Sequence, residues 1–114
     1  MPNSSKVNSH FERDTAGEAI YVSVAEDGNI AGFVSVWMPQ SFIHHLYVHP
    51  DARGQGVATT LLDFLHGRVP LPWRLKCGQQ NTRAASFYLH RGWNLIDQVQ
   101  SGEEPFFLLE FTGE

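Results

Sequence analysis

The amino-acid sequence predicts an α/β (α+β) domain with a mixed, mostly antiparallel sheet, in the element order β-β-β-α-β-α-β-β. Two observations carry this prediction. Residues 20–25 alternate in the period of a half-buried strand, and strand-like segments rich in β-branched and aromatic residues follow at 30–38 and 42–48, with turn residues between them. From residue 57 onward, segments with apolar residues at helical spacing alternate with further strand-like segments.

Length and composition limit the class of protein. The chain has 114 residues, 42% hydrophobic and 18% charged, which suits one compact domain. Eight Lys and Arg against twelve Asp and Glu give a net charge of −4, which argues against a nucleic-acid-binding protein. The single cysteine excludes an internal disulfide, and no apolar run resembles a membrane span or a signal peptide. We therefore expect a cytoplasmic protein without nucleic-acid or membrane partners.

The first half of the chain is predicted to form strands. Residues 1–19 are polar and weakly patterned, and we expect a flexible or short-helical segment there. Residues 20–38 form a hairpin around an Asp-Gly turn, because this dipeptide tolerates positive φ angles. Residues 42–48 form a third strand, which Pro50 closes.

The second half, within a domain that we place at residues 20–111, is predicted to contain two helices and three strands. One helix begins at Val57, after a glycine-containing loop, and ends near Gly67. Asn81 caps a second helix that continues to about His90. The strands cover residues 73–77, 93–99 and 105–111.

The junction between the third strand and the first helix is the most informative segment. It reads HHLYVHPDARGQGVATTLL, with Gly54 and Gly56 directly before the helix. The first turn of a helix has four backbone N–H groups without intrahelical acceptors, and the helix dipole favours an anion there. Glycines let the backbone approach a ligand closely, so the loop suits a phosphate or pyrophosphate. A tight turn with close packing is the alternative explanation.

Two common nucleotide-binding motifs do not fit this loop. The dinucleotide fingerprint needs a third glycine, and position 59 is Thr. It also needs an acidic residue about twenty positions on, where the sequence reads RVPLPWRLK. The P-loop needs Gly-Lys-Ser/Thr, which this loop lacks.

Two motifs resemble those of the GNAT family of N-acetyltransferases. LYVHPDARGQGVATTLL resembles the family's acetyl-CoA motif, Gln/Arg-x-x-Gly-x-Gly/Ala, with Arg53, Gly56 and Ala58 at its three defined positions. NTRAASFYLHRGW resembles the second motif, Asn-x-x-Ala-x-x-aromatic/Leu-Tyr-x-x-x-Gly-Phe/Trp. The final PFFLLEF is similar to the family's closing strand. The second motif is filled by Asn81, Ala84, Phe87, Tyr88, Gly92 and Trp93.

This resemblance implies a binding site for acetyl-CoA as co-substrate. The backbone of residues 46–48 would pair with the pantetheine amides, and the loop amides would hold the pyrophosphate. The second helix would border the thiol end. The implied coenzyme-binding residues are Leu46, Tyr47, Val48, Arg53, Gly54, Gln55, Gly56, Val57, Ala58, Thr59, Asn81, Ala84, Phe87 and Tyr88.

The resemblance also implies acetyl transfer to the primary amine of a small molecule or peptide, by direct attack in a ternary complex. Tyr88 is the expected general acid for the leaving thiolate, because a phenol is protonated at neutral pH; core packing is its alternative role. Relatives carry Glu or His on the strand before the loop, so His44 is the expected base, with water as the alternative. We expect His44 and His45 to point to opposite faces of the strand.

We expect no metal site. His45 and His49 are four residues apart on one strand, about 13 Å, which is too far for both to bind one ion. Cys77 alternates with Trp73 and Leu75, so we expect a buried, inert thiol rather than a nucleophile. Four cations either balance the coenzyme's phosphates or are simply solvated: Arg74, Lys76, Arg83 and Arg91.

The sequence departs from the family before the hairpin. Relatives place a strand and two helices there, and we expect most of these elements to be missing from residues 1–19. The apolar surface left uncovered would favour a homodimer. Two alternative functions follow: a non-catalytic acyl-CoA-binding module with an incomplete acceptor site, and an interaction domain that keeps only the fold.

Overall fold

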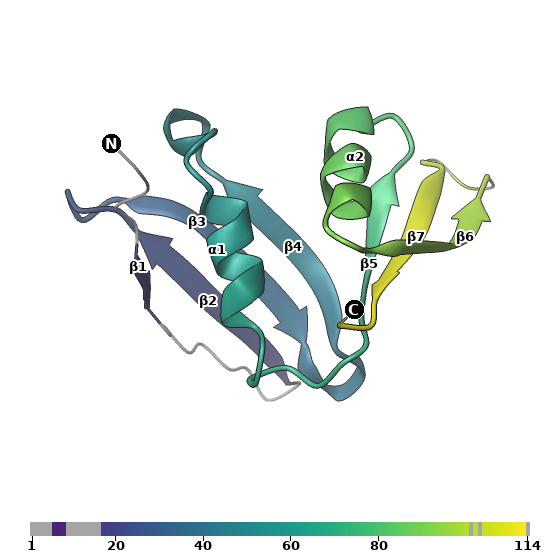
Figure 1. The fold of residues 1–114 in the computed structure, drawn as a ribbon, viewed down its shortest axis with the longest axis horizontal. Helices are drawn as coiled ribbons and strands as arrows, with labels where there is room; N and C mark the ends of the chain where they lie inside the picture. The colour runs from purple at the N-terminus through teal and green to yellow at the C-terminus, as the bar shows by residue number, and fades with distance from the viewer. Residues whose placement is uncertain (1–5, 9–16, 101, 103, 114) are drawn as a thin grey trace. The chain divides into compact units, whose positions relative to one another are not determined.

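The computed structural model describes residues 6–8, 17–100, 102 and 104–113 (Figure 1). The chain divides between Pro70 and Leu71 into two compact units. Each unit has an antiparallel sheet and one α-helix.

The sheet of the first unit has the strand order β1-β2-β3-β4, with each strand antiparallel to the next. Helix α1 crosses one face of this sheet (Figure 1). Two short 3₁₀ turns, η1 and η2, precede and follow β4. The elements are β1 (Lys6–Asn8), β2 (Glu18–Val24), β3 (Ile30–Trp37), η1 (Met38–Gln40), β4 (Phe42–Val48), η2 (Pro50–Ala52) and α1 (Val57–Phe64).

The core of the first unit lies between α1 and the sheet. Alternation along β2 and β3 turns one set of side chains toward the helix, and α1 contributes its apolar stripe. The ring of Tyr21 meets that of Phe64 edge to face, with centroids 5.5 Å apart. Its buried members include Ala19, Tyr21, Val34, Val36, Val57, Leu61, Leu62 and Leu65.

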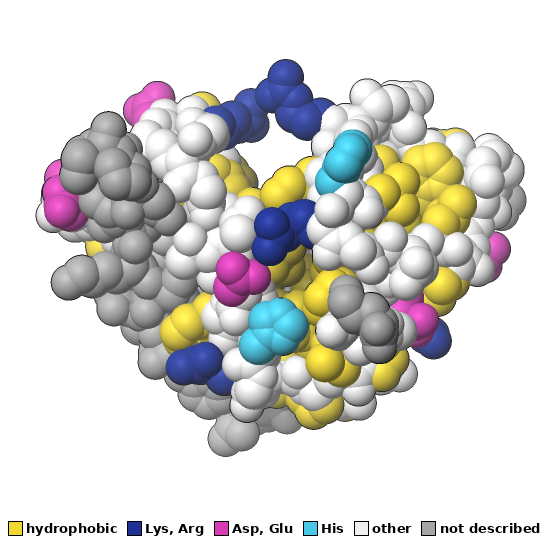
Figure 2. Space-filling view, viewed as in Figure 1, with side chains coloured by type: hydrophobic (Ala, Val, Ile, Leu, Met, Phe, Trp, Pro, Cys, Tyr) yellow, Lys and Arg dark blue, Asp and Glu magenta, His cyan; other side chains and the backbone are white. Residues whose placement is uncertain are grey.

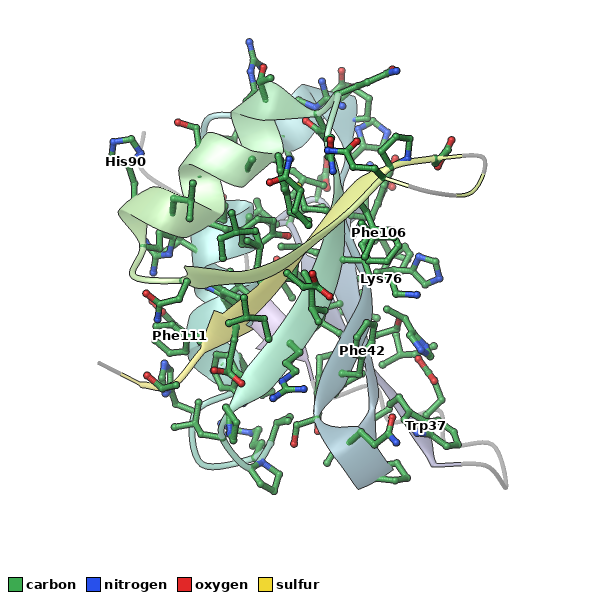
Figure 3. The ribbon with its side chains drawn as sticks, turned by 90° about the vertical axis from the view of Figure 1, so that its right-hand side faces the viewer. Trp37, Phe42, Lys76, His90, Phe106 and Phe111 are labelled. Atoms are coloured by element: carbon green, nitrogen blue, oxygen red, sulfur yellow. The ribbon has the colours of Figure 1, made fainter. Side chains whose placement is uncertain are left out.

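The opposite face of this sheet carries aromatic side chains that are half-buried or, at Tyr47, exposed. Trp37 pairs with Phe42 across β3 and β4, and Figure 3 shows both on that side of the strands. The rings of Phe33 and Tyr47, which also pair, have centroids 5.5 Å apart. We call these four residues the aromatic face.

The second unit has the strand order β5-β7-β6, again antiparallel. Alternation in β5 turns Trp73, Leu75 and Cys77 inward, where all three are buried. The elements are β5 (Trp73–Gly78), α2 (Thr82–His90), β6 (Asn94–Val99) and β7 (Phe106–Phe111).

Aromatic rings form the core of the second unit. Trp73, Trp93 and Phe111 lie with ring centroids 5.3 to 6.5 Å apart, and Tyr88 of α2 contacts Trp93 edge to face. Phe111 lies on the α2 side of the strands and Lys76 on the other, as Figure 3 shows. The packing therefore fixes α2 on one face of this sheet.

The predicted fold class and element order are confirmed from β2 onward. The expectation for residues 1–19 is wrong where the structure describes them, because Lys6–Asn8 forms a strand that pairs with β2, and β2 itself begins at Glu18. Residues 1–5 and 9–16 lie outside the described residues. Helix α1 ends at Phe64 rather than near Gly67, because i+3 hydrogen bonds of 3₁₀ type tighten the chain there.

Candidate active site

The loop between β4 and α1 is fixed by short-range hydrogen bonds. The backbone N–H of His49 donates to the carbonyl of Ala31 at 2.7 Å, which ties the end of β4 to β3. The ring Nδ1 of His49 accepts the backbone N–H of Asp51 at 3.0 Å and so caps η2. Gly54 and Gly56 then adopt left-handed φ angles of 80° and 79°.

The backbone amides of residues 54–59 are available to a ligand. Among the described parts of the chain, none of these N–H groups has a recorded acceptor; the first internal bond of the helix is Thr60 N–H to Gly56 O, at 2.9 Å. These amides sit at the positive end of the α1 dipole. Arg53, which is exposed, precedes them. The arrangement suits an anion with several oxygen atoms.

Gly32 allows β4 and the start of α1 to pack closely against β3. A Cβ atom at this position would lie 2.4 Å from the backbone oxygen of Tyr47 and 3.0 Å from Cγ1 of Val57. No side chain fits there without a backbone shift. The absence of a side chain at Gly32 therefore sets the position of the strand end and of the loop that follows it.

The strand residues assigned to pantetheine pairing lie at the end of the first unit's sheet. Leu46, Tyr47 and Val48 pair on one side with Val34, Phe33 and Gly32. Tyr47 is 42% exposed. Backbone pairing of an amide-containing ligand with a strand follows the same rules as addition of a peptide strand.

His44 lies beside Glu18, a residue that no local sequence pattern singles out. Its Nδ1 atom is 3.1 Å from Oε2 of Glu18, and the side chains are 44% and 21% exposed. Glu18 is the first residue of β2 and pairs with Trp37, so it reaches His44 from across β3. Only the register of three strands, which is not local in sequence, brings the pair together.

The expectation that His44 and His45 point to opposite faces is wrong. The β3–β4 register pairs Ser35 with His45 and Val36 with Ile43, so His44 is the extra residue of a β-bulge. The bulge breaks the alternation, and the two imidazole rings lie with centroids 6.3 Å apart. Both histidines therefore lie close together at one place on β4.

The described residues contain no group of three or more His, Cys, Asp or Glu side chains arranged to hold a metal ion. His49 is instead engaged in capping, as described above. No helix in the described part of the chain is long and apolar enough to cross a membrane.

In the second unit, α2 carries the residues of the second motif. Asn81 caps the helix as predicted, because its Oδ1 atom accepts the backbone N–H of Ala84 at 3.1 Å. Tyr88 is 8% exposed, and burial, followed by the nearby Cys77, raises the pKa of its phenol well above the ordinary value. The phenol is therefore protonated at neutral pH, as a general acid requires, while its ring also fills the core.

Cys77 is a buried thiol, in agreement with the prediction. It is 5% exposed, and burial raises its pKa, so the thiolate form is disfavoured. Its Sγ atom lies 3.8 Å from the carbonyl of Gly78 and 4.0 Å from that of Asn81. These contacts describe a packed side chain rather than a nucleophile beside a base.

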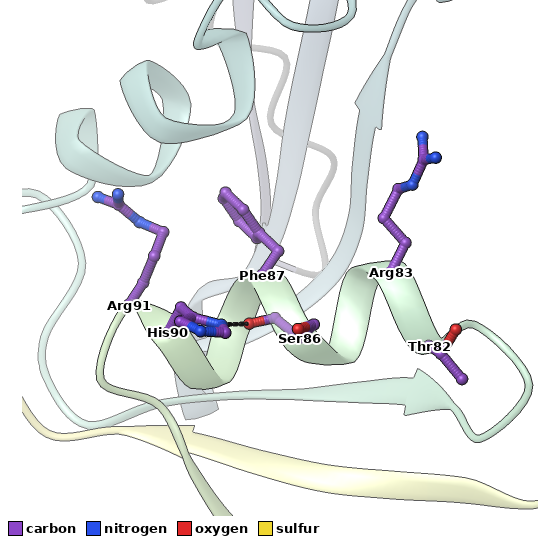
Figure 4. Close-up of a pocket in the computed structure, with 6 residues that line it drawn as sticks. All are labelled: Thr82, Arg83, Ser86, Phe87, His90 and Arg91. Atoms are coloured by element: carbon purple, nitrogen blue, oxygen red, sulfur yellow. Dashed lines mark hydrogen bonds between the residues drawn. The ribbon is translucent and has the colours of Figure 1, made fainter.

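The exposed side of α2 carries a shallow pocket with two arginines. Arg83, Phe87 and Arg91 project to the same side of the helix (Figure 4), and the Arg91 guanidinium lies 5.7 Å from the centre of the Phe87 ring. Basic side chains are visible at the surface around α2 (Figure 2). The pocket lining consists of Thr82, Arg83, Ser86, Phe87, His90 and Arg91.

The other two predicted cations have partners on the opposite face of the second unit. Arg74 Nε lies 2.9 Å from Oε2 of Glu110, and Lys76 Nζ lies 4.8 Å from the centre of the Phe106 ring. These contacts favour the interpretation of Arg74 and Lys76 as solvated surface charges. For Arg83 and Arg91, both interpretations remain: a solvated charge, or a charge that balances the coenzyme's phosphates.

Comparisons with known proteins identify the family. Residues 2–93 match the acetyltransferase (GNAT) family. The fold is similar to that of nourseothricin acetyltransferase, with a TM-score of 0.70 and 19% sequence identity over 97% of this chain and 88% of that one. It is also similar to a spermidine N-acetyltransferase chimera from Vibrio cholerae and hSSAT, with a TM-score of 0.72 and 14% identity over 86% of this chain and 69% of that one. A GNAT-family acetyltransferase from Staphylococcus aureus gives a TM-score of 0.68 and 13% identity over 87% of this chain and 70% of that one. A comparison with curated protein sequences gave no match. The chain belongs to the GNAT family of acetyltransferases.

Proposed function

We propose that this protein transfers an acetyl group from acetyl-CoA to the primary amine of a small molecule or peptide. Membership of the GNAT family supports acetyl transfer in general. The observation that carries the proposal is the row of backbone amides at residues 54–59, which have no acceptor among the described residues and stand at a helix N-terminus. A diphosphate supplies the charge and the oxygen atoms that such a row would bind.

The proposed coenzyme contacts use backbone groups rather than charged side chains. The edge of β4 at residues 46–48 would pair with the pantetheine amides, and the loop amides would hold the diphosphate. Arg53 would add one positive charge near the loop. The α2 residues Asn81, Ala84 and Phe87 are proposed as further contacts. Backbone recognition of this kind is sensitive to the φ angles of Gly54 and Gly56.

The proposed chemistry is direct transfer in a ternary complex. The amine nitrogen attacks the thioester carbonyl, the new N–C bond forms, and the C–S bond breaks. The nitrogen loses a proton to His44, and the departing sulfur takes a proton from Tyr88. Burial keeps the phenol protonated until sulfur gains charge, which is the state that a donor needs.

A pair of valine substitutions at glycines of equal φ tests the coenzyme site. Gly56 is the N-cap of α1 and Gly67 follows the turn after its C-terminus; their φ angles are 79° and 80°, so valine meets similar backbone strain at both positions. We expect Gly56→Val to weaken acetyl-CoA binding about 10-fold or more in isothermal titration, and Gly67→Val to leave it unchanged. Equal affinities for both variants would contradict the proposed site.

Turnover is tested with thiol release from acetyl-CoA over a panel of primary amines. Release that depends on the amine supports the transferase. Coenzyme binding without release on any amine would instead support the non-catalytic acyl-CoA-binding module. Absence of binding at millimolar acetyl-CoA would leave only the shared fold.

A further inference from the structure

The contact between His44 and Glu18 has a consequence for how the histidine is protonated. An ionised carboxylate only accepts hydrogen bonds, so at the 3.1 Å separation the proton lies on Nδ1 of His44, which donates to Oε2 of Glu18. In neutral imidazole the other nitrogen then carries the lone pair. We propose that Glu18 is a positioning residue that holds His44 with Nδ1 protonated and Nε2 ready to accept a proton from the acceptor amine.

The surroundings of the pair support this assignment. Glu18 is only 21% exposed, so its carboxylate is partly shielded from water and its orientation is restricted by the sheet. The ring of Phe42 lies edge to face against His44, with centroids 5.5 Å apart, and limits rotation of the imidazole. The bulge at His44 changes the direction of its side chain, so that the imidazole reaches Glu18 of β2. Regular alternation along β4 does not predict this contact. The imidazole is therefore held from two directions.

Among the described residues, the ionisable groups with a recorded contact to His44 belong to two elements of the first unit. Glu18 belongs to β2 and His45 to β4 itself. Strand β3, which lies between them, has no ionisable side chain in Ile30–Trp37. Among the described residues, Glu18 therefore supplies a carboxylate in contact with His44, and the ring of His45 lies 6.3 Å from that of His44, centroid to centroid.

This inference rests on the proposed function, and it adds a proton path. The amine nitrogen forms its bond to the carbonyl carbon and gives a proton to Nε2 of His44. The resulting imidazolium carries its positive charge beside the Glu18 carboxylate, and the proton leaves to water. Glu18 does not take the proton; it fixes the tautomer and balances the charge, as a carboxylate does for a catalytic histidine in other enzymes.

The tautomer is measured directly by long-range ¹H–¹⁵N spectra of the imidazole rings at a pH at which His44 is neutral. We expect His44 to show a protonated Nδ1 and a bare Nε2 in the wild type. Glu18→Ala should shift the population toward the Nε2-protonated form that free histidine prefers, and Glu18→Gln should partly restore the original form, because the amide oxygen still accepts. A wild-type His44 with a protonated Nε2 would overturn the inference.

Kinetics separate positioning from a structural role. We expect Glu18→Ala to lower kcat about 10-fold with little change in KM. The loss is smaller than the full contribution of a general base, because His44 itself remains in this variant. Glu26→Gln, on the exposed β2–β3 turn, is the matched control and should leave kcat unchanged. In a His44→Gln background, Glu18→Ala should have no further effect on kcat. Equal losses in both backgrounds would overturn the inference.

The two proposals fail in distinguishable ways. A wild-type protein that transfers no acetyl group to any amine, but shows the Nδ1-protonated tautomer, would contradict the proposed function and leave the pairing in place. An active protein with the opposite tautomer would contradict only the role of Glu18.

Discussion

Gly32→Ala tests how close packing positions the coenzyme strand. The added Cβ would lie 2.4 Å from the backbone oxygen of Tyr47, whereas ordinary contact begins at 3.4 Å, so the two backbones must separate by about 1 Å. The same atom would lie 3.0 Å from Cγ1 of Val57, at the first residue of α1. A backbone oxygen cannot turn away as a flexible side chain does, so the strain falls on the strand end and the loop.

The magnitude follows from known costs of overpacking. Inserting a methyl group into a tightly packed site costs about 1–3 kcal/mol. Alanine also lowers the conformational entropy of the unfolded chain, which stabilises the folded state by about 0.4–1 kcal/mol. We therefore expect Gly32→Ala to lower the free energy of unfolding by about 1–2 kcal/mol. Because residues 46–48 form the proposed pantetheine-binding strand, a displacement of about 1 Å should also weaken acetyl-CoA binding by roughly 10-fold.

The assay compares Gly32→Ala with Gly78→Ala. Gly78 also lies in a strand, but nothing lies within 4 Å of its added Cβ. Urea unfolding and isothermal titration with acetyl-CoA measure stability and affinity on the same samples. We expect Gly78→Ala to keep the wild-type affinity and to be more stable than the wild type by about 0.4–1 kcal/mol. If the two variants behave alike in unfolding and in binding, the argument from close packing is refuted.

Three further outcomes are expected. Tyr88→Phe keeps the ring contacts with Phe87 and Trp93 and should lower kcat about 100-fold with an unchanged Kd for acetyl-CoA; full activity would remove Tyr88 as the proton donor. Asn81→Ala removes the α2 cap and should cost about 1 kcal/mol in urea unfolding, with Asn81→Ser close to wild type; equal stability of the alanine variant would show that the cap contributes nothing. Burial raises the pKa values of Cys77 and Tyr88, so folding favours their protonated forms, and the free energy of unfolding should fall as pH rises above about 9; a flat pH profile between 8 and 11 would contradict that burial.

Local patterns were sufficient for most of the fold. The third predicted strand has the observed bounds, Phe42–Val48, because a segment of β-branched and aromatic residues between prolines is a local signal. The Asn81 cap is likewise a property of one short segment. Strand β1 could not be recognised, since three residues, Lys6–Asn8, are too few to show a period, and pairing with β2 defines the strand.

The candidate site depends more on contacts that are distant in sequence. The loop amides follow from the glycine positions, and the sequence locates them correctly at the start of α1. The bulge at His44 depends on register between β3 and β4, which no local pattern encodes. Glu18 meets His44 across 26 positions of sequence, so its role appears only once the sheet is assembled.

The most direct test of the coenzyme site is an amide ¹H–¹⁵N titration of the protein with acetyl-CoA. If the diphosphate binds at the N-terminus of α1, the backbone N–H signals of residues 54–59 move downfield together and saturate with the affinity measured by calorimetry. If the coenzyme binds while these signals stay fixed and others move, the diphosphate is held elsewhere and the assignment of this loop is wrong.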